Sequence, residues 1–423
     1  MKKLAMAAMI ITWGALSLQA ATVTTKKSDT GWQLLVDGKP YFVKGVGCNT
    51  AVGEKGEDYL KMARDMGANS TRTWGITPKS YFDKAKEYGI MVNAGIWFNA
   101  IRGGIKESYQ DAEHCKRLKA EALAHVREMK NHPALLTWNL GNEVFAFTES
   151  EEEKKAFGLF LEDLAKAVKK EDPKHPVSYA CSGRTDIPFL IRYVPSLDIV
   201  GVNAYGTFSY VLKYMRDNKY DKPVLLTEFG SFGDWDRMKD VNQQPYDPYD
   251  QNKAQNFADM WREVMQSPDM TVGGYAFVLG DMRNQASLTW YNMNFEDKKR
   301  ASYWTMYKLY TGEEPKNHPP KIRLLKVDKV NGLKPGERIS VEVTASDVDG
   351  DPLKINYMIT DIASDPLIVE PWRSYPTQTE KMSKTSAKIS VPNEPGVYRV
   401  YALVEDGKDN IAVANRSILV GGL

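Results

Sequence analysis

From about residue 22 to residue 315, short apolar runs alternate with amphipathic segments along the chain. The runs at 90–98 and 222–230 are nearly continuous in apolar residues, which is typical of parallel strands that are buried on both faces. The segments at 107–130 and 251–265 carry their apolar residues at helical spacing. This alternation predicts a parallel sheet in which each strand is followed by a helix.

The pattern predicts eight strand-to-helix units. An Asp37-Gly38 turn should join a hairpin that leads into the first strand. Strands are expected at 41–47, 68–74, 90–98, 134–143, 176–180, 197–205, 222–230 and 271–281. Helices are expected in seven of these units, after every strand but the fifth, at 56–67, 78–89, 107–130, 151–170, 209–218, 251–265 and 301–310. Eight units close most naturally into a (β/α)8 TIM barrel. A doubly wound open sheet is the alternative, but no strand is followed by a glycine-rich phosphate-binding loop.

The pattern of apolar and polar residues changes after residue 310. Pro315, Pro319 and Pro320 mark a linker, and apolar and polar residues alternate beyond it with turn signals between the runs. We therefore expect the barrel to occupy residues 21–315 and an immunoglobulin-like, all-β sandwich to occupy residues 316–423.

The first 20 residues have the pattern of a secretory signal peptide. Lys2 and Lys3 precede an apolar run from Leu4 to Leu18, and small residues follow near Ala20. The run is too short to span a bilayer comfortably, and no Cys follows it that could carry a lipid anchor. We expect cleavage near Ala20 and a secreted or periplasmic protein with no membrane segment after cleavage.

The composition excludes several classes of function. The net charge is +2 over 423 residues, which does not favour nucleic acid or an anionic membrane as a partner. The five His lack zinc-ligand spacing, and no Gly-x-Ser-x-Gly motif occurs. The acidic run at 347–351 is interpreted as a turn rather than a Ca²⁺ loop. We expect no metal, no cofactor and a monomer.

Two glutamates end two of the expected strands. Glu143 ends the fourth strand and Glu228 the seventh. In a TIM barrel, residues at the C-terminal ends of the strands face the active site. One protonated and one ionised carboxyl group are what retaining glycoside hydrolysis requires. The alternative for either residue alone is a surface salt bridge or a contact with a helix N-terminus.

The segments WNLGNE and LLTEFG resemble the acid/base and nucleophile segments of clan A glycoside hydrolases, which are retaining (β/α)8 enzymes. The resemblance implies that Glu143 is the acid/base and Glu228 the nucleophile. It also implies that Asn142 binds the 2-hydroxyl group of the sugar, that Arg72 keeps Glu228 ionised, and that Tyr205 hydrogen-bonds the nucleophile. The alternatives are an internal salt bridge for Arg72 and a packed rim aromatic for Tyr205.

Aromatic residues near strand ends are candidates for stacking on sugar rings. The clan commonly presents a Trp at strand eight, where this chain offers Phe277 or Tyr275, and a His after strand three, where it offers Trp97 and Asn99. Trp138 is expected in the barrel core. The candidate substrate-binding residues are therefore Trp74, Trp97, Asn99, Trp235, Phe277 and Trp290. Packing in the core or in a loop is the alternative for each aromatic residue.

The sequence favours a secreted retaining β-glycosidase that acts on a polysaccharide or oligosaccharide. The domain arrangement is similar to that of family 158 endo-β-1,3-glucanases. A β-mannanase, a β-1,4-glucanase, a β-galactosidase or a transglycosylase of the same clan remains open. A glycan-binding protein without turnover and an adhesion protein that uses the sandwich are the alternatives from other classes.

Overall fold

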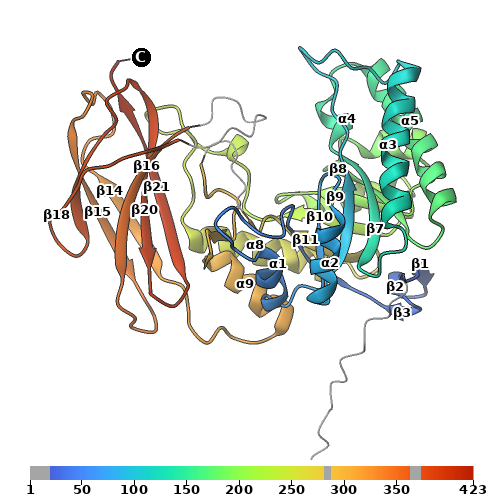
Figure 1. Ribbon diagram of the computed structural model, residues 1–423, viewed down its shortest axis with the longest axis horizontal. Helices are drawn as coiled ribbons and strands as arrows, with labels where there is room; N and C mark the ends of the chain where they lie inside the picture. The colour runs from blue at the N-terminus through green and yellow to red at the C-terminus, as the bar shows by residue number, and fades with distance from the viewer. Residues whose placement is uncertain (1–19, 281–286, 363–372, 423) are drawn as a thin grey trace, which may run out of the picture.

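The computed structural model of the chain describes residues 20–280, 287–362 and 373–422 (Figure 1). The signal peptide expected at 1–20 lies outside these residues except for Ala20. Within the described ranges, no helix combines the length and the apolar character that crossing a bilayer requires.

Eight parallel strands form a closed barrel, in the order β10-β11-β4-β5-β6-β7-β8-β9. The closed barrel confirms the predicted (β/α)8 architecture and excludes the doubly wound open sheet. The barrel strands are β4 (Val43–Gly47), β5 (Ser70–Arg72), β6 (Met91–Ile96), β7 (Leu135–Asn142), β8 (Val177–Ser182), β9 (Ile199–Asn203), β10 (Val224–Phe229) and β11 (Thr271–Ala276).

The helices mostly match the amphipathic segments of the sequence. They are α1 (Tyr59–Asp65), α2 (Lys79–Glu87), α3 (Ala112–Met129), α4 (Val144–Phe147), α5 (Glu151–Glu171), α6 (Ile187–Tyr193), α7 (Phe208–Asp217), α8 (Asp250–Met265) and α9 (Ala301–Thr311), with a 3-10 turn η1 at Asp234–Asp236.

Two details of the helices differ from the prediction. Helix α3 begins at Ala112 rather than near residue 107, because the Asp111 side chain accepts the backbone N–H groups of Glu113 and His114 and so caps the helix there. Helices α4 and α6 were not predicted. They have four and seven residues and no side-chain cap, so their amphipathic signals are too short to stand out.

A small antiparallel sheet covers the N-terminal ends of the barrel strands. It consists of β1 (Val23–Ser28), β2 (Gly31–Val36) and β3 (Lys39–Pro40), with the expected Asp37-Gly38 turn between β2 and β3. Leu34 of β2 packs in one buried cluster with Leu225 and Val272, which lie at the starts of β10 and β11. The opposite end of the barrel is therefore the end left for a functional site.

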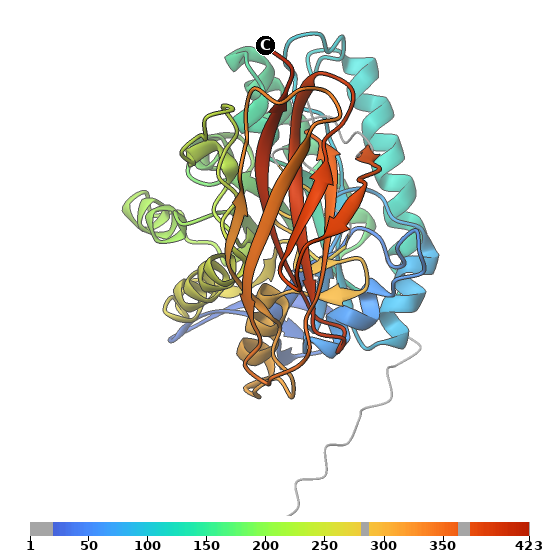
Figure 2. The same ribbon diagram turned by 90° about the vertical axis from the view of Figure 1, so that its left-hand side faces the viewer.

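The C-terminal part is an all-β sandwich that lies beside the barrel in Figure 1 and faces the viewer in Figure 2. Its two four-stranded antiparallel sheets have the orders β14-β15-β19-β18 and β17-β16-β20-β21. Residues from both sheets, such as Ile389 and Val400, share one buried cluster. The strands are β14 (Lys321–Val327), β15 (Arg338–Ser346), β16 (Lys354–Asp361), β17 (Ser374–Tyr375), β18 (Thr379–Lys381), β19 (Ser386–Ser390), β20 (Gly396–Glu405) and β21 (Ile411–Val420). The more specific immunoglobulin-like assignment stays a prediction.

The proline-rich segment connects the two parts where the sequence placed a linker. Residues 312–320 run between α9 and β14. A short hairpin of β12 (Asn294–Phe295) and β13 (Lys298–Lys299) follows β11 on the barrel side of this connection.

Candidate active site

Glu143 and Glu228 both lie at the C-terminal ends of barrel strands. Glu228 is the next-to-last residue of β10, and Glu143 directly follows β7. Glu143 has a left-handed backbone with φ of 55°, and its N–H group donates to the Ala180 carbonyl of β8 at 2.8 Å. A non-glycine residue rarely adopts this conformation, and such residues are concentrated at functional sites.

A chain of hydrogen bonds joins the two acids. Arg72 Nη1 donates to Glu228 Oε1 at 2.7 Å, and Arg72 Nη2 donates to Asn142 Oδ1 at 2.7 Å. The amide nitrogen of Asn203 then donates to Asn142 Oδ1 at 3.0 Å and to Glu143 Oε1 at 2.8 Å. The fold thus brings together both predicted acids and both predicted polar partners, Arg72 and Asn142.

Glu228 is buried and accepts hydrogen bonds from three side chains. Besides Arg72, the Trp74 indole donates to Oε1 at 2.7 Å, and the Tyr205 hydroxyl donates to Oε2 at 2.9 Å. Three donors converging on one carboxylate stabilise its negative charge and fix its orientation. Tyr205 lies where the resemblance implied.

Trp74 was predicted to form a wall for a sugar, and in the structure its indole contacts the residues of the carboxyl site. Its N–H group bonds to Glu228, and its ring lies 4.8 Å from the Arg72 guanidinium and 5.4 Å from the Phe277 ring. Both ends of the indole are therefore used to hold the carboxylate and its arginine in place.

Glu143 has a different electrostatic environment from Glu228. Burial, and then the nearby negative charge of Glu228, raise the pKa of Glu143 to about 8, although the Asn203 hydrogen bond opposes the rise. Both effects favour the protonated form of Glu143. Two neighbouring carboxyl groups in different surroundings can act as a proton donor and an anion.

Asn203 was missed as an individual residue by the sequence analysis. It ends β9, two residues before Tyr205, and the Thr227 hydroxyl donates to its side-chain oxygen at 2.8 Å. This bond orients the amide so that its nitrogen faces Asn142 and Glu143. The signal was present in the segment VNAY, because an amide at a barrel strand end is a candidate for the site.

A buried tyrosine and aspartate support the turn that carries Glu143. The Tyr179 hydroxyl accepts the Phe145 N–H group of α4 at 3.3 Å and donates to Asp186 at 3.3 Å. Asp186 is fully buried, and burial raises its pKa to about 7 although Ser182 and Thr185 also donate to it. The sequence analysis did not identify this pair.

Trp97 and Trp235 are the predicted aromatics with rings open to solvent. They are 50% and 62% exposed and follow β6 and β10, respectively. The Trp97 indole donates to Asn99 Oδ1 at 3.0 Å, and the Trp235 ring lies 5.9 Å from Tyr205. Trp235 therefore lies beside a residue that bonds to Glu228, and Asn99 orients the exposed Trp97 ring.

Trp290 and Phe277 are buried, which contradicts the prediction that they contact the substrate. Trp290 is 1% exposed, and its N–H group bonds to the Phe232 carbonyl at 3.0 Å. Phe277 is 5% exposed, with its ring 5.4 Å from Trp74 and 6.1 Å from Tyr205. Rings packed in this way offer no face to a sugar, so these residues support the site from behind.

Other sequence predictions lie outside this site. Trp138 is fully buried and donates to Asp172, as expected for a core residue. In the sandwich, carboxylate oxygens of Asp347, Asp351 and Asp406 lie within 4.8 Å of one another. Acidic groups of this kind are common without an ion, and we assign no metal to them.

Comparison with known proteins identifies the barrel. The family model for the TIM barrel domain of glycosyl hydrolases family 2 matches residues 30–295. A β-glucuronidase of Felis catus is 27% identical over 248 residues, which are 51% of this chain and 34% of the relative. A β-glucuronidase of Paenibacillus borealis is 22% identical over 308 residues, which are 66% of this chain and 49% of the relative.

Solved structures with the same fold have low sequence identity. Bacteroides uniformis β-glucuronidase 2, covalently bound to cyclophellitol-6-carboxylate aziridine, has a TM-score of 0.53 at 16% identity and covers 96% of this chain and 49% of that chain. A putative β-galactosidase from Bacteroides fragilis has a TM-score of 0.52 at 15% identity and covers 96% and 58%, respectively.

These comparisons correct the assignment to family 158. The chain spans about half or less of the curated relatives that it matches, so the match concerns the barrel rather than their whole length. The family model covers well over half of this chain and includes every residue of the carboxyl site described above. The chain therefore belongs to glycosyl hydrolases family 2, through its TIM barrel domain.

Proposed function

We propose that this chain is a retaining β-glycosidase. The observation that carries the proposal is the hydrogen-bonded path from Glu228 through Arg72, Asn142 and Asn203 to Glu143. It holds one carboxylate among three donors beside a second carboxyl group whose pKa is raised by burial and by the charge of Glu228. A glycan-binding protein without turnover would not need this arrangement.

The proposed reaction has two steps. In the first, the Glu228 carboxylate attacks the anomeric carbon while Glu143 gives its proton to the departing oxygen. A covalent glycosyl-enzyme forms, and the leaving alcohol is released. In the second, Glu143 takes a proton from water, whose oxygen attacks the same carbon and releases Glu228. The configuration at the anomeric carbon is retained.

For the substrate we favour a neutral β-hexoside, with a β-glucuronide as the second candidate. A β-glucuronide is supported because several of the relatives and solved structures described above are β-glucuronidases. The charges favour the neutral sugar, because Arg72 already bonds to Glu228, Thr227 and Asn142, and Asp234 adds a carboxyl group near Tyr291. A uronate would bring a further negative charge to this acidic site.

Trp97 and Trp235 support a substrate that extends beyond one sugar, because each follows a barrel strand and presents an exposed ring. The family 2 match gives no support to endo-β-1,3-glucanase activity.

The test uses aryl β-glycosides of glucose, galactose, mannose and glucuronic acid, together with laminarin, mannan and galactan. We expect cleavage of at least one neutral β-hexoside, with retention of configuration seen by NMR of the first product. Inversion would exclude Glu228 as a nucleophile. Cleavage of the glucuronide alone would favour the second candidate.

Export and oligomeric state are also proposals. We propose that the chain is exported after cleavage near Ala20 and acts as a monomer. Sequencing the N-terminus of the protein from the culture fluid and periplasm, and measuring its mass by light scattering, test these points. An uncleaved chain that stays in the cytoplasm would exclude export.

A further inference from the structure

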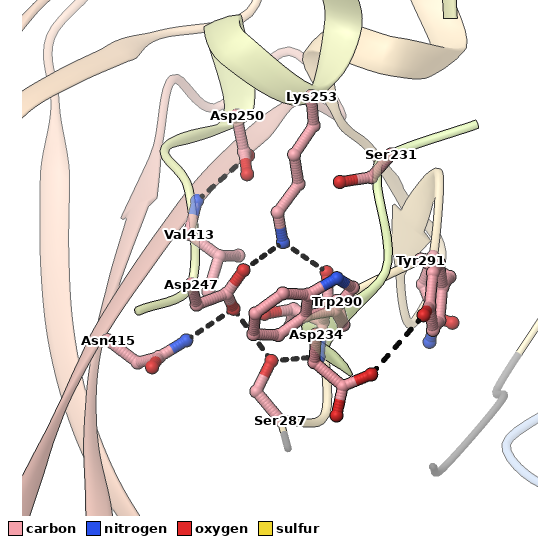
Figure 3. A network of polar contacts seen from close by, with 12 residues as sticks. Ser231, Asp234, Asp247, Asp250, Lys253, Ser287, Trp290, Tyr291, Val413 and Asn415 are labelled. Atoms are coloured by element: carbon pink, nitrogen blue, oxygen red, sulfur yellow. Dashed lines mark hydrogen bonds and ion pairs between the residues drawn. The ribbon is translucent and has the colours of Figure 1, made fainter. Parts of the chain in front are cut away.

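A buried polar cluster joins the C-terminal sandwich to the barrel (Figure 3). At its centre is Asp247, which lies between β10 and α8. Asp247 forms an ion pair with Lys253 of α8 at 2.5 Å and accepts hydrogen bonds from Ser287 and from Asn415 of β21, both at 2.6 Å. The sandwich thus supplies a partner to a buried acid of the barrel.

The charges of this cluster are buried and paired. Burial lowers the pKa of Lys253 to about 8, against the attraction of Asp247. Burial alone would raise the pKa of Asp247, but Lys253 and Ser287 outweigh it and hold that pKa below its usual value. A second buried pair, Arg300 and Asp250, lies alongside. Removing one partner from such a cluster is costly, so its geometry is strongly constrained.

The same cluster holds the segment 287–292, which lies beyond β11. The Lys253 ammonium donates to the Thr289 carbonyl at 2.9 Å, and Arg300 donates to that carbonyl at 2.6 Å. From the sandwich, the Tyr401 hydroxyl accepts the Leu288 N–H group at 3.1 Å. Buried groups of both parts of the chain therefore fix the backbone of this segment.

Segment 287–292 leads directly to the carboxyl site. Its Tyr291 ring lies 5.8 Å from Tyr205 and 5.4 Å from Phe277. Tyr205 in turn donates a hydrogen bond to Glu228 at 2.9 Å. Consecutive contacts thus connect the sandwich with the carboxylate proposed as nucleophile.

We propose that the C-terminal sandwich contributes to the glycosidase site. Asn415 and Tyr401 are positioning residues that brace segment 287–292. They thereby hold Tyr291 against Tyr205, which donates a hydrogen bond to Glu228. The effect on activity rests on the proposed function, whereas the bracing itself does not. The sandwich then has a role that does not require it to bind any glycan.

Two variants remove the brace from the sandwich side. Tyr401→Phe removes the acceptor of the Leu288 N–H group, and Asn415→Ala removes a donor to Asp247. The matched control is Trp304→Phe. It removes the 2.6 Å hydrogen bond from α9 to Asn410, which also joins the barrel to the sandwich but does not contact segment 287–292.

Two measurements are made on the full chain. Hydrogen exchange followed by mass spectrometry reports the protection of peptides that contain residues 287–293. The rate of covalent labelling by a cyclophellitol aziridine, in the sugar configuration that the wild type cleaves, reports the reactivity of Glu228. We expect exchange to be about tenfold faster and labelling about tenfold slower in Tyr401→Phe and Asn415→Ala, and both to be unchanged in Trp304→Phe.

The outcomes separate the two proposals. Wild-type exchange in 287–293 for both variants would overturn the brace, as would equal effects in Trp304→Phe. Faster exchange with wild-type labelling would overturn the link to Glu228. If the wild-type chain is neither labelled nor active on any glycoside, the proposed function fails, and exchange alone then decides whether the sandwich braces this segment.

Discussion

Asn203 donates one 2.8 Å hydrogen bond to Glu143, across 60 residues of sequence, and its own orientation is fixed by Thr227. We expect Asn203→Ala to lower kcat/KM by roughly 10- to 100-fold, since removing one partner of a buried hydrogen bond costs about 1–3 kcal/mol. Because this bond lowers the pKa of Glu143, its loss should also move the alkaline limb of the pH profile of kcat/KM to higher pH.

Thr227→Val should have a smaller effect in the same direction. An unchanged pH profile in Asn203→Ala would argue against contact between Asn203 and the acid/base Glu143.

Removal of the Glu143 carboxyl group should affect substrates according to their leaving group. Glu143→Gln cannot donate a proton, so natural glycosides with poor leaving groups should lose activity most, and nitrophenyl glycosides least. A series of aryl glycosides with graded phenol pKa values measures this dependence. An equal loss across the series would remove Glu143 from the role of proton donor.

Asp186 should shift the working pH range. Its negative charge raises the pKa of Glu143, so Asp186→Asn should lower that pKa and move the alkaline limb of kcat/KM to lower pH. The Asn side chain keeps the capacity to bond to Tyr179. Alanine at the same position should add a loss of kcat, because the turn at Phe145 loses support.

The stability of the protein should also depend on Asp186. Its pKa is about 7 in the folded protein, against an ordinary value of 3.8. The protonated form is favoured by folding, so this contribution is fully present below pH 3.8 and is lost as the pH rises through 7. Between pH 4 and 8, the free energy of unfolding of the wild type should fall relative to that of Asp186→Asn. Parallel curves from urea titrations would contradict the burial argument.

The Trp74 indole should act on Glu228 through its N–H group. The Phe ring has no hydrogen-bond donor, so Trp74→Phe should keep a ring beside Arg72 and Phe277 while removing one hydrogen bond to Oε1. We expect the rate of glycosyl-enzyme formation to fall about tenfold with little change in KM. If only KM rose, Trp74 would instead contact the sugar, as first predicted.

The exposed tryptophans should contribute to binding of long substrates. Trp97→Ala and Trp235→Ala should each raise KM for an oligosaccharide roughly 5- to 30-fold, as expected for loss of about 1–2 kcal/mol of stacking. Aryl monoglycosides should be affected less if the rings contact distant sugar units. Wild-type KM values on all substrates would remove both residues from the binding surface.

The sequence by itself determined the barrel, the two acids and several of their partners. Strand ends in a TIM barrel converge on one face, so the position of Glu143 after β7 and of Glu228 in β10 could be read from local apolar patterns. Arg72 and Tyr205 were implied by the resemblance to clan A glycoside hydrolases, and they lie at the end of β5 and just after β9, respectively. The assignment to family 158 was wrong because it depended on the domain arrangement alone.

Only the tertiary structure decided what each aromatic and polar side chain contacts. Trp290 and Trp235 both follow barrel strands, yet one is buried and the other is exposed. Likewise, Asp247 pairs with Asn415 across 168 residues, and Asp186 lies behind a turn that begins at Glu143. Apolar periodicity reports which face of an element is buried, whereas these contacts depend on the packing of segments distant in sequence, which no local pattern records.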